Sequence, residues 1–256
     1  MCGRYASSRR PEDLVEEFEI ADSRVATPLE PDYNVAPTKE VYAVVERPPR
    51  RAEDDAAPEP AERQLRVLRW GLVPSWAKDP SIGNRMINAR METVAEKPAF
   101  RRAFAARRCL LPADGYFEWY PTAQTTKAGK PMKQPFFIRP RDGGILAMAG
   151  LYEIWKDPTR TDDDPDRFRW TCTVLTTEAE DAVGHIHDRM PLMVERDRWA
   201  AWLDPAPADA EDLLGLLRPA APGNLDAYPV ATLVNNVRNN GPELLEPLPL
   251  HDVPAT

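Results

Sequence analysis

Runs of β-branched, aromatic and aliphatic residues recur along the chain, and they constrain its fold more than any other feature. Such runs, bounded by proline, glycine and charged residues, are typical of strands. We expect strands over residues 40–46, 64–73, 135–140, 145–155, 168–177 and 226–234, and two short ones within 109–120 around a turn at 113–115. Apolar residues at helical spacing predict short helices over 11–18, 97–108, 195–203 and 209–217. Strands dominate and do not alternate regularly with helices, which predicts an α+β fold: a curved, mostly antiparallel sheet or open barrel with flanking helices.

The domain organisation predicted from this pattern is a single domain over residues 1–256, with a core of about residues 2–240. Two charged, apolar-poor segments, 47–63 and 156–168, are expected to be exposed, mobile loops. Strands flank the first segment closely, so we interpret it as a loop rather than a domain linker. A further polar loop is expected over 127–134.

The cysteines and histidines argue against disulfide and metal frameworks. Cys2, Cys109 and Cys172 are widely spaced and odd in number, so a disulfide framework is not expected. The chain has three histidines and no Cys-x-x-Cys pair, so no metal site is expected. His185 and His187 are expected to lie on a strand rather than in one metal shell.

No apolar run approaches the length needed to span a membrane, and the first residues lack a secretory signal. We therefore expect a cytoplasmic protein that makes no membrane contact.

The net charge of −8 argues against binding to nucleic acid, whose phosphates attract clustered lysine and arginine. The average hides a local excess, because residues 84–108 hold seven basic and two acidic side chains, a balance of +5. The basic residues are Arg85, Arg90, Lys97, Arg101, Arg102, Arg107 and Arg108. Two interpretations stay open: a basic face on an acidic body, or the solvated surface of a helix.

The first residues, MCGRYA, carry the most specific chemistry. Methionine is generally removed before a small residue, so we expect the mature chain to begin at Cys2, a 1,2-aminothiol. An α-amino group has a pKa of about 7.7–8.0, so roughly a tenth is free amine at neutral pH and can form a Schiff base with an aldehyde. The thiol can then close a thiazolidine ring in an intramolecular step. Each of these residues also has a structural interpretation: Cys2 as a buried small residue, Gly3 as a turn glycine and Arg4 as a surface arginine.

Three further groups of residues carry candidate chemistry. Asn88 and Arg90 alternate with apolar residues, so both project from one strand face. The amide can orient a sugar or a reacting group, and the arginine can bind a phosphate. Glu118 lies between aromatic residues that would desolvate it and raise its pKa. His187 can transfer protons near neutral pH, with Arg189 on the same strand face. The alternative for Asn88 and Arg90 is an ordinary polar strand face, and the alternative for Glu118 is a carboxylate that faces solvent.

These blocks, in this order, resemble the SOS-response-associated peptidase (SRAP) family, the abasic-site processing proteins. The resemblance spans about residues 2–240 and departs from the family at none of the matching stretches. Those stretches are MCGRYA, YNVAPT, RWGLVPSWAKD, NARMETV, FRRAFAARRCLLPADGYFEWY, MAGLYEIW, TVLTTEA and HIHDRMPLMV.

The resemblance implies an active site and a DNA-binding groove. The active site would comprise Cys2 as the nucleophile with Asn88, Glu118 and His187. The groove would bind single-stranded DNA through phosphate contacts from Arg4, Arg90 and Arg189, with Trp70 stacking on a base. The peptidase activity in the family name is best understood as removal of residues ahead of the cysteine.

We therefore expect a monomeric protein of the DNA damage response that forms a thiazolidine crosslink between Cys2 and the aldehyde of an abasic site. The chemistry needs no cofactor, and incidental lyase activity is expected. The protein would associate with the nucleoid when bound to DNA. Two rival functions remain: a cysteine or N-terminal-nucleophile peptidase using Cys2 with His187, and a non-catalytic single-stranded DNA-binding protein with a structural Cys2.

Overall fold

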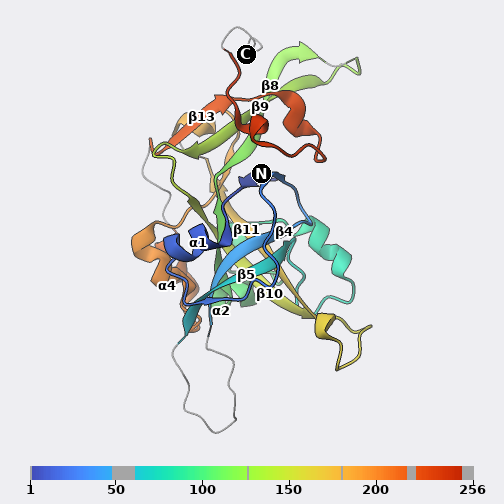
Figure 1. Cartoon of the computed structure of the whole chain (residues 1–256), viewed down its shortest axis with the longest axis vertical. Helices are drawn as coiled ribbons and strands as arrows, with labels where there is room; N and C mark the ends of the chain where they lie inside the picture. The colour runs from blue at the N-terminus through green and yellow to red at the C-terminus, as the bar shows by residue number, and fades with distance from the viewer. Residues whose placement is uncertain (1, 48–60, 126, 180, 218–222, 250–256) are drawn as a thin grey trace.

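The computed structural model describes residues 2–47, 61–125, 127–179, 181–217 and 223–249, which form two sheets with short helices around them (Figure 1). Most of the predicted loop 47–63 lies outside the described residues.

The larger sheet has eight strands and closes into a barrel. Its strands are, from edge to edge, β12 (Arg189–Pro191), β11 (Phe168–Glu178), β10 (Leu146–Lys156), β7 (Arg108–Ala113), β4 (Glu40–Arg47), β5 (Glu62–Trp70) and β2 (Asp22–Ser23), and β6 (Asn88–Arg90) pairs with β11. Closure comes from a short parallel pairing of β5 with β11, in which Arg69 lies opposite Thr171 and Trp70 opposite Cys172. The strands β11, β10, β7, β4 and β5 thereby form a five-stranded barrel.

The smaller sheet has five antiparallel strands and lies above the barrel in Figure 1. Their order is β13 (Leu225–Pro229), β9 (Pro131–Pro140), β8 (Gly115–Thr125), β1 (Tyr5–Ser7) and β3 (Asp32–Val35). The chain passes from one sheet to the other at Asp114, between β7 and β8. The predicted α+β architecture with a curved, mostly antiparallel sheet is confirmed.

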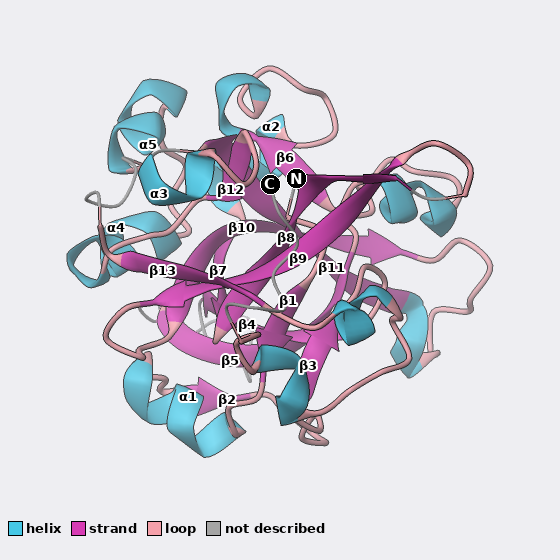
Figure 2. Cartoon of the chain, turned by 90° about the horizontal axis from the view of Figure 1, so that it is seen from above, coloured by secondary structure: helices cyan, strands magenta, loops and turns pink. Residues whose placement is uncertain are grey.

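The helices surround the strands when the molecule is seen from above (Figure 2). They are α1 (Pro11–Glu17), α2 (Arg101–Ala106), α3 (Asp181–Gly184), α4 (Trp199–Leu203) and α5 (Ala210–Leu216), with 3₁₀ turns η1 (Pro80–Arg85), η2 (Met91–Thr93), η3 (Pro165–Arg167), η4 (Arg196–Arg198), η5 (Thr232–Asn235) and η6 (Pro242–Leu245). Apolar residues of α1, α2, α4 and α5 pack with one face of β4, β7 and β10 in a single buried cluster. Burial of this amphipathic face stabilises helices that are too short to form alone.

A second apolar cluster connects the barrel to the smaller sheet. Alternate residues of β4 and β5, such as Val45 and Leu68, belong to this cluster, as the period of two in a strand requires. Cys2, Tyr116 and Ile138, from the smaller sheet and the segment that leads into it, belong to the same cluster. The core is therefore continuous between the two sheets.

Three predicted elements differ from the structure. His185 and His187 follow α3 in a turn and lie on no strand, because β12 begins only at Arg189. The polar residues 131–134 are part of β9, where pairing with β8 satisfies their backbone. The predicted helix 97–108 is shorter than expected, because Arg108 starts β7 and its buried guanidinium donates hydrogen bonds to carbonyls of Phe104 and Trp202.

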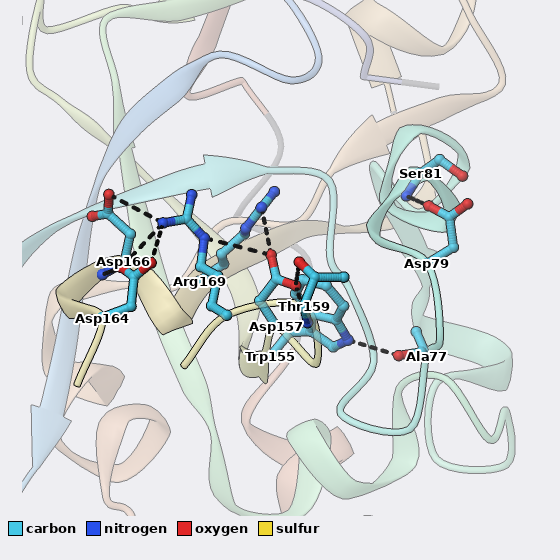
Figure 3. A network of polar contacts seen from close by, with 10 residues as sticks. Ala77, Asp79, Ser81, Trp155, Asp157, Thr159, Asp164, Asp166 and Arg169 are labelled. Carbon is cyan, nitrogen blue, oxygen red and sulfur yellow. Dashed lines mark hydrogen bonds and ion pairs between the residues drawn. The ribbon is translucent and has the colours of Figure 1, made fainter. Parts of the chain in front are cut away.

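The segment between β10 and β11, predicted as a loop, is held by a network of polar contacts (Figure 3). The Asp157 carboxylate accepts hydrogen bonds from the Thr159 hydroxyl at 2.7 Å and from Arg169 at 2.6 Å. The neighbouring Trp155 donates its indole N–H to the Ala77 carbonyl at 2.7 Å. These contacts join the loop to the segment that follows β5.

Within the described ranges no helix is long and apolar enough to cross a membrane, and no group of three or more His, Cys, Asp or Glu side chains is arranged to hold a metal ion. The three cysteines are free and buried.

Candidate functional site

Cys2 lies fully buried where the chain enters β1. Burial, together with the negative charge of Glu118, raises the pKa of its thiol far above the usual range, while a hydrogen bond from the Arg4 backbone N–H favours the thiolate more weakly. The sulfur is therefore protonated at neutral pH in the resting protein.

Asn88 holds the backbone of Cys2. Its side-chain amide donates a hydrogen bond to the Cys2 carbonyl oxygen at 2.8 Å. Asn88 reaches this position because β6 adds to β11 in parallel, with Asn88 opposite Val174. The amide oxygen is buried without a hydrogen-bond partner in the described part of the chain.

A close approach between two glycines directs the chain from β5 back to β6. Gly71 has a φ of 123°, which favours glycine, and a Cβ there would lie 2.6 Å from the Gly83 carbonyl oxygen. The same turn lets Leu72 donate a backbone hydrogen bond to Met86. A side chain at either glycine would therefore clash with the other glycine's carbonyl and disturb the turn that leads to β6.

Glu118 lies on β8 and is 3% exposed. Burial raises the pKa of its carboxyl to about 7, and the nearby Asp188 adds to the shift. A group with that pKa both donates and accepts protons at neutral pH. The predicted desolvation of Glu118 is thus present in the structure.

His187 faces Glu118, with Nε2 4.0 Å from a Glu118 carboxylate oxygen. Its Nδ1 accepts a hydrogen bond from the Arg189 backbone N–H at 2.9 Å and also lies 2.9 Å from a carboxylate oxygen of Asp188. Partial burial lowers the pKa of His187, which favours the neutral imidazole. The ring nitrogen that faces Glu118 is Nε2.

Arg4 is half-buried and held by two acceptors. Its guanidinium donates to the Asn34 side-chain oxygen at 2.7 Å and to the Val234 carbonyl at 2.8 Å, and it lies over the Trp119 ring at 5.7 Å. Asn34 is itself fully buried, and its amide donates to carbonyls of the segment 234–239. Our sequence analysis missed Asn34, although it lies within the matching YNVAPT stretch.

The other two predicted phosphate contacts differ in their surroundings. Arg90 is exposed at the end of β6. Arg189 pairs with both carboxylate oxygens of Glu92, at 2.8 and 3.0 Å, and donates to the Thr176 carbonyl at 2.7 Å. DNA contact by either residue stays a prediction, and Arg189 would have to exchange Glu92 for a phosphate.

The burial of Trp70 contradicts its predicted stacking on a base. The ring is 0% exposed, packs against Tyr5 at 5.2 Å between ring centroids, and donates its N–H to the Ile87 carbonyl. The exposed tryptophan of the same RWGLVPSWAKD stretch is Trp76, with 55% of its surface accessible. The sequence does not show this difference, because the burial of Trp70 depends on its tertiary contacts with Tyr5 and Ile87.

The basic segment 84–108 has a mixed role. Arg108 is buried and hydrogen-bonded to carbonyls, and Arg107 pairs with the buried carboxylate of Glu153. The remaining five basic residues, Arg85, Arg90, Lys97, Arg101 and Arg102, are exposed. Part of the predicted basic surface is therefore present, and part of the charge stabilises the fold.

The structure brings the four predicted active-site residues into one place from distant parts of the sequence. Asn88 contacts the Cys2 backbone, His187 faces Glu118, and the charge of Glu118 acts on the Cys2 thiol. A buried sulfur, a carboxyl that titrates near neutral pH and a neutral imidazole suit proton transfers during attack on a carbonyl carbon.

Comparisons with known proteins agree with the resemblance. A family described as SOS response associated peptidase (SRAP) matches residues 1–237. The abasic site processing protein YoqW of Bacillus subtilis is 37% identical over 96% of this chain and 99% of its own length. The abasic site processing protein HMCES of Xenopus tropicalis is 29% identical over 96% of this chain and 78% of its own. A crystal structure of a Bacteroides thetaiotaomicron protein superposes with a TM-score of 0.75 at 25% identity, covering 96% of this chain and all of that one.

Proposed function

Since the chain belongs to the SOS response associated peptidase (SRAP) family, we propose that it processes abasic sites in single-stranded DNA and captures them covalently through Cys2. The relatives named as abasic site processing proteins support the substrate class. The observation that carries the chemistry is the placement of the Cys2 backbone, held by Asn88, beside the pair of Glu118 and His187.

Schiff-base formation is the first step of the proposed reaction. The sugar of an abasic site is mostly a closed hemiacetal. As it opens to the aldehyde, His187 takes the proton of the C1 hydroxyl and, as imidazolium, acts as the general acid that returns a proton to the ring oxygen. The α-amine of processed Cys2 then attacks the aldehyde carbon. Glu118, whose pKa is about 7, takes a proton from the nitrogen and returns one to the hydroxyl, which leaves as water.

Ring closure is the second step. The sulfur adds to the carbon of the C=N bond, the π electrons move to nitrogen, and the thiol proton is transferred to that nitrogen through Glu118. Because burial keeps the thiol protonated, the amine reacts first and the sulfur second. If closure is slow, the Schiff base undergoes β-elimination, which is the source of incidental lyase activity.

The DNA strand would lie across the basic residues beside the site. We assign phosphate contacts to Arg4, Arg90 and Arg189, and base stacking to the exposed Trp76 in place of Trp70. The resulting contacts with the backbone are independent of sequence.

The decisive experiment is denaturing electrophoresis of the protein after incubation with abasic single-stranded DNA. The unsubstituted protein should give a heat-stable adduct, and Cys2→Ser should give none, because an oxazolidine is far less durable than a thiazolidine. Cys172→Ala serves as the control, since it removes another buried thiol. Undiminished heat-stable crosslinking by the serine variant would exclude the mechanism.

A free amino terminus is the second requirement. Any residue retained ahead of Cys2, whether Met1 or a tag, converts the amine into a delocalised amide that is not a nucleophile. Intact mass and crosslinking yield should therefore vary together, with no adduct from extended protein. Full yield from protein whose mass shows an intact extension throughout the assay contradicts attack by the amine.

Two experiments separate this function from its rivals. A cysteine peptidase acting on other substrates would cleave peptides and would form no heat-stable adduct with abasic DNA. A non-catalytic binder would hold intact and abasic DNA equally and reversibly. Incubation with a peptide panel and the denaturing gel test these two alternatives.

A further inference from the structure

The hydroxyl of Tyr116 is buried and has no hydrogen-bond partner in the described part of the chain. The whole residue is 0% exposed. A buried hydroxyl without a partner is unfavourable, because the group has lost its hydrogen bonds to water. Phenylalanine would fill the same space without that loss, so the hydroxyl itself needs an explanation.

The position of Tyr116 directs it toward the reacting groups. It precedes Glu118 by two residues on β8, and side chains two apart on a strand project from the same face. Tyr116 pairs with Tyr5 on β1 and belongs to the same buried cluster as Cys2. Burial and the nearby charges of Cys2 and Glu118 raise the pKa of its hydroxyl well above 10, so the group remains a proton-bearing donor.

Ring closure is the step at which such a donor is needed. The sulfur of Cys2 must develop thiolate character to attack carbon, and both its burial and the charge of Glu118 oppose this. The Arg4 backbone N–H donates one hydrogen bond to the sulfur. A second donor from the opposite strand would lower the cost of the negative charge.

We propose that the Tyr116 hydroxyl donates a hydrogen bond to the Cys2 sulfur as it becomes a thiolate and closes the thiazolidine ring. This assignment rests on the proposed function. The S–C bond forms, the C=N π pair becomes the lone pair of the ring nitrogen, and the thiol proton ends on that nitrogen. Tyr116 keeps its own proton throughout, so the step needs no leaving group and no co-reactant.

The test is Tyr116→Phe, which removes one oxygen atom and preserves the packing of the ring. Alkylation of Cys2 by iodoacetamide, followed across pH by mass spectrometry of the N-terminal peptide, reports the thiol directly. We expect the profile to move to higher pH by about one unit, which corresponds to alkylation roughly tenfold slower at a fixed pH. The melting temperature should stay the same or rise, because an unpartnered buried hydroxyl has been removed.

The crosslinking reaction gives a second readout. Ring closure should slow by about tenfold, while the initial rate of Schiff-base formation, measured by borohydride trapping at early times, stays that of the unsubstituted protein. The longer-lived Schiff base should release more cleaved DNA strand by β-elimination. A merely structural role for Tyr116 would not shift the Schiff base from ring closure toward strand cleavage.

Tyr5→Phe is the matched control, because its hydroxyl is also buried without a described partner and its residue pairs directly with Tyr116. It should leave the alkylation profile in place. An unchanged profile for Tyr116→Phe, or an equal shift for Tyr5→Phe, would overturn the assignment. The alkylation measurement uses no DNA, so it distinguishes failure of this hydrogen bond from failure of abasic-site capture.

Discussion

Glu118 shows how a single buried carboxyl connects the stability of the protein to its chemistry. The pKa of its side chain rises from the ordinary 4.5 to about 7 because burial penalises the charged form. The folded protein therefore binds this proton more tightly than the unfolded chain does. The resulting stabilisation is complete below pH 4.5 and is lost as the pH rises through about 7.

Glu118→Gln should remove this pH dependence. At pH 8 the variant should be more stable than the unsubstituted protein, by up to about 3 kcal/mol or several degrees in melting temperature, and at pH 5 the difference should be small. Thermal unfolding at both pH values measures it, with exposed Glu16→Gln as the control. A variant destabilised equally at pH 5 and pH 8 would show that ionisation of the buried Glu118 carboxyl does not lower the stability of the protein at high pH.

Trp76 is the residue at which exposure corrects the sequence-based assignment. We expect Trp76→Ala to weaken binding to intact single-stranded DNA by about 1–3 kcal/mol, the usual contribution of one stacked base. Fluorescence anisotropy at fixed salt provides the measurement. Phe168→Ala is the control, since Phe168 is also exposed, at 52%, but lies at the start of β11. Equal losses in both variants would point to a general effect of surface aromatic residues.

Among the elements, the short strand β6 carries two residues of the proposed chemistry. Asn88 faces Cys2, and Arg90, two residues later, is exposed. Arg90→Ala should therefore reduce DNA affinity for all sequences and lower the slope of log affinity against log salt by about 0.7 to 1. Arg196→Ala, which removes an arginine 59% exposed and paired with Glu17 and Glu19, should leave the slope unchanged. An unchanged slope for Arg90→Ala would remove β6 from the phosphate path.

The elements also show which structural information a sequence contains. The predictions of β4, β5, β10 and β11 succeeded because long runs of β-branched and aromatic residues are a local signal. The closure of the barrel depends on the parallel pair of β5 and β11, which leaves no local trace. Motifs are also local signals, and they indicated the candidate site residues Cys2, Asn88, Glu118 and His187. The burial of Trp70 and the anchoring role of Asn34 depend on tertiary contacts, which the sequence does not show.

At the scale of the whole molecule, the continuous core predicts cooperative behaviour. Residues of both sheets share the cluster around Cys2, Tyr116 and Leu68, so neither sheet can lose its packing alone. We expect a single calorimetric transition whose van't Hoff and calorimetric enthalpies agree. Two resolved transitions would show instead that the two sheets unfold independently, against the predicted single domain.

The hydrogen bond from Arg4 to Val234 joins residues 230 positions apart, and Asn34 reaches the same C-terminal segment across about 200 residues. During translation the N-terminus leaves the ribosome long before its neighbours at 234–239. The hydrogen bonds of Arg4 and Asn34 to this segment therefore form only after all the intervening residues have been made. The start of the chain thus reaches its final packing late, although Asn88, Glu118 and His187 have been made by then.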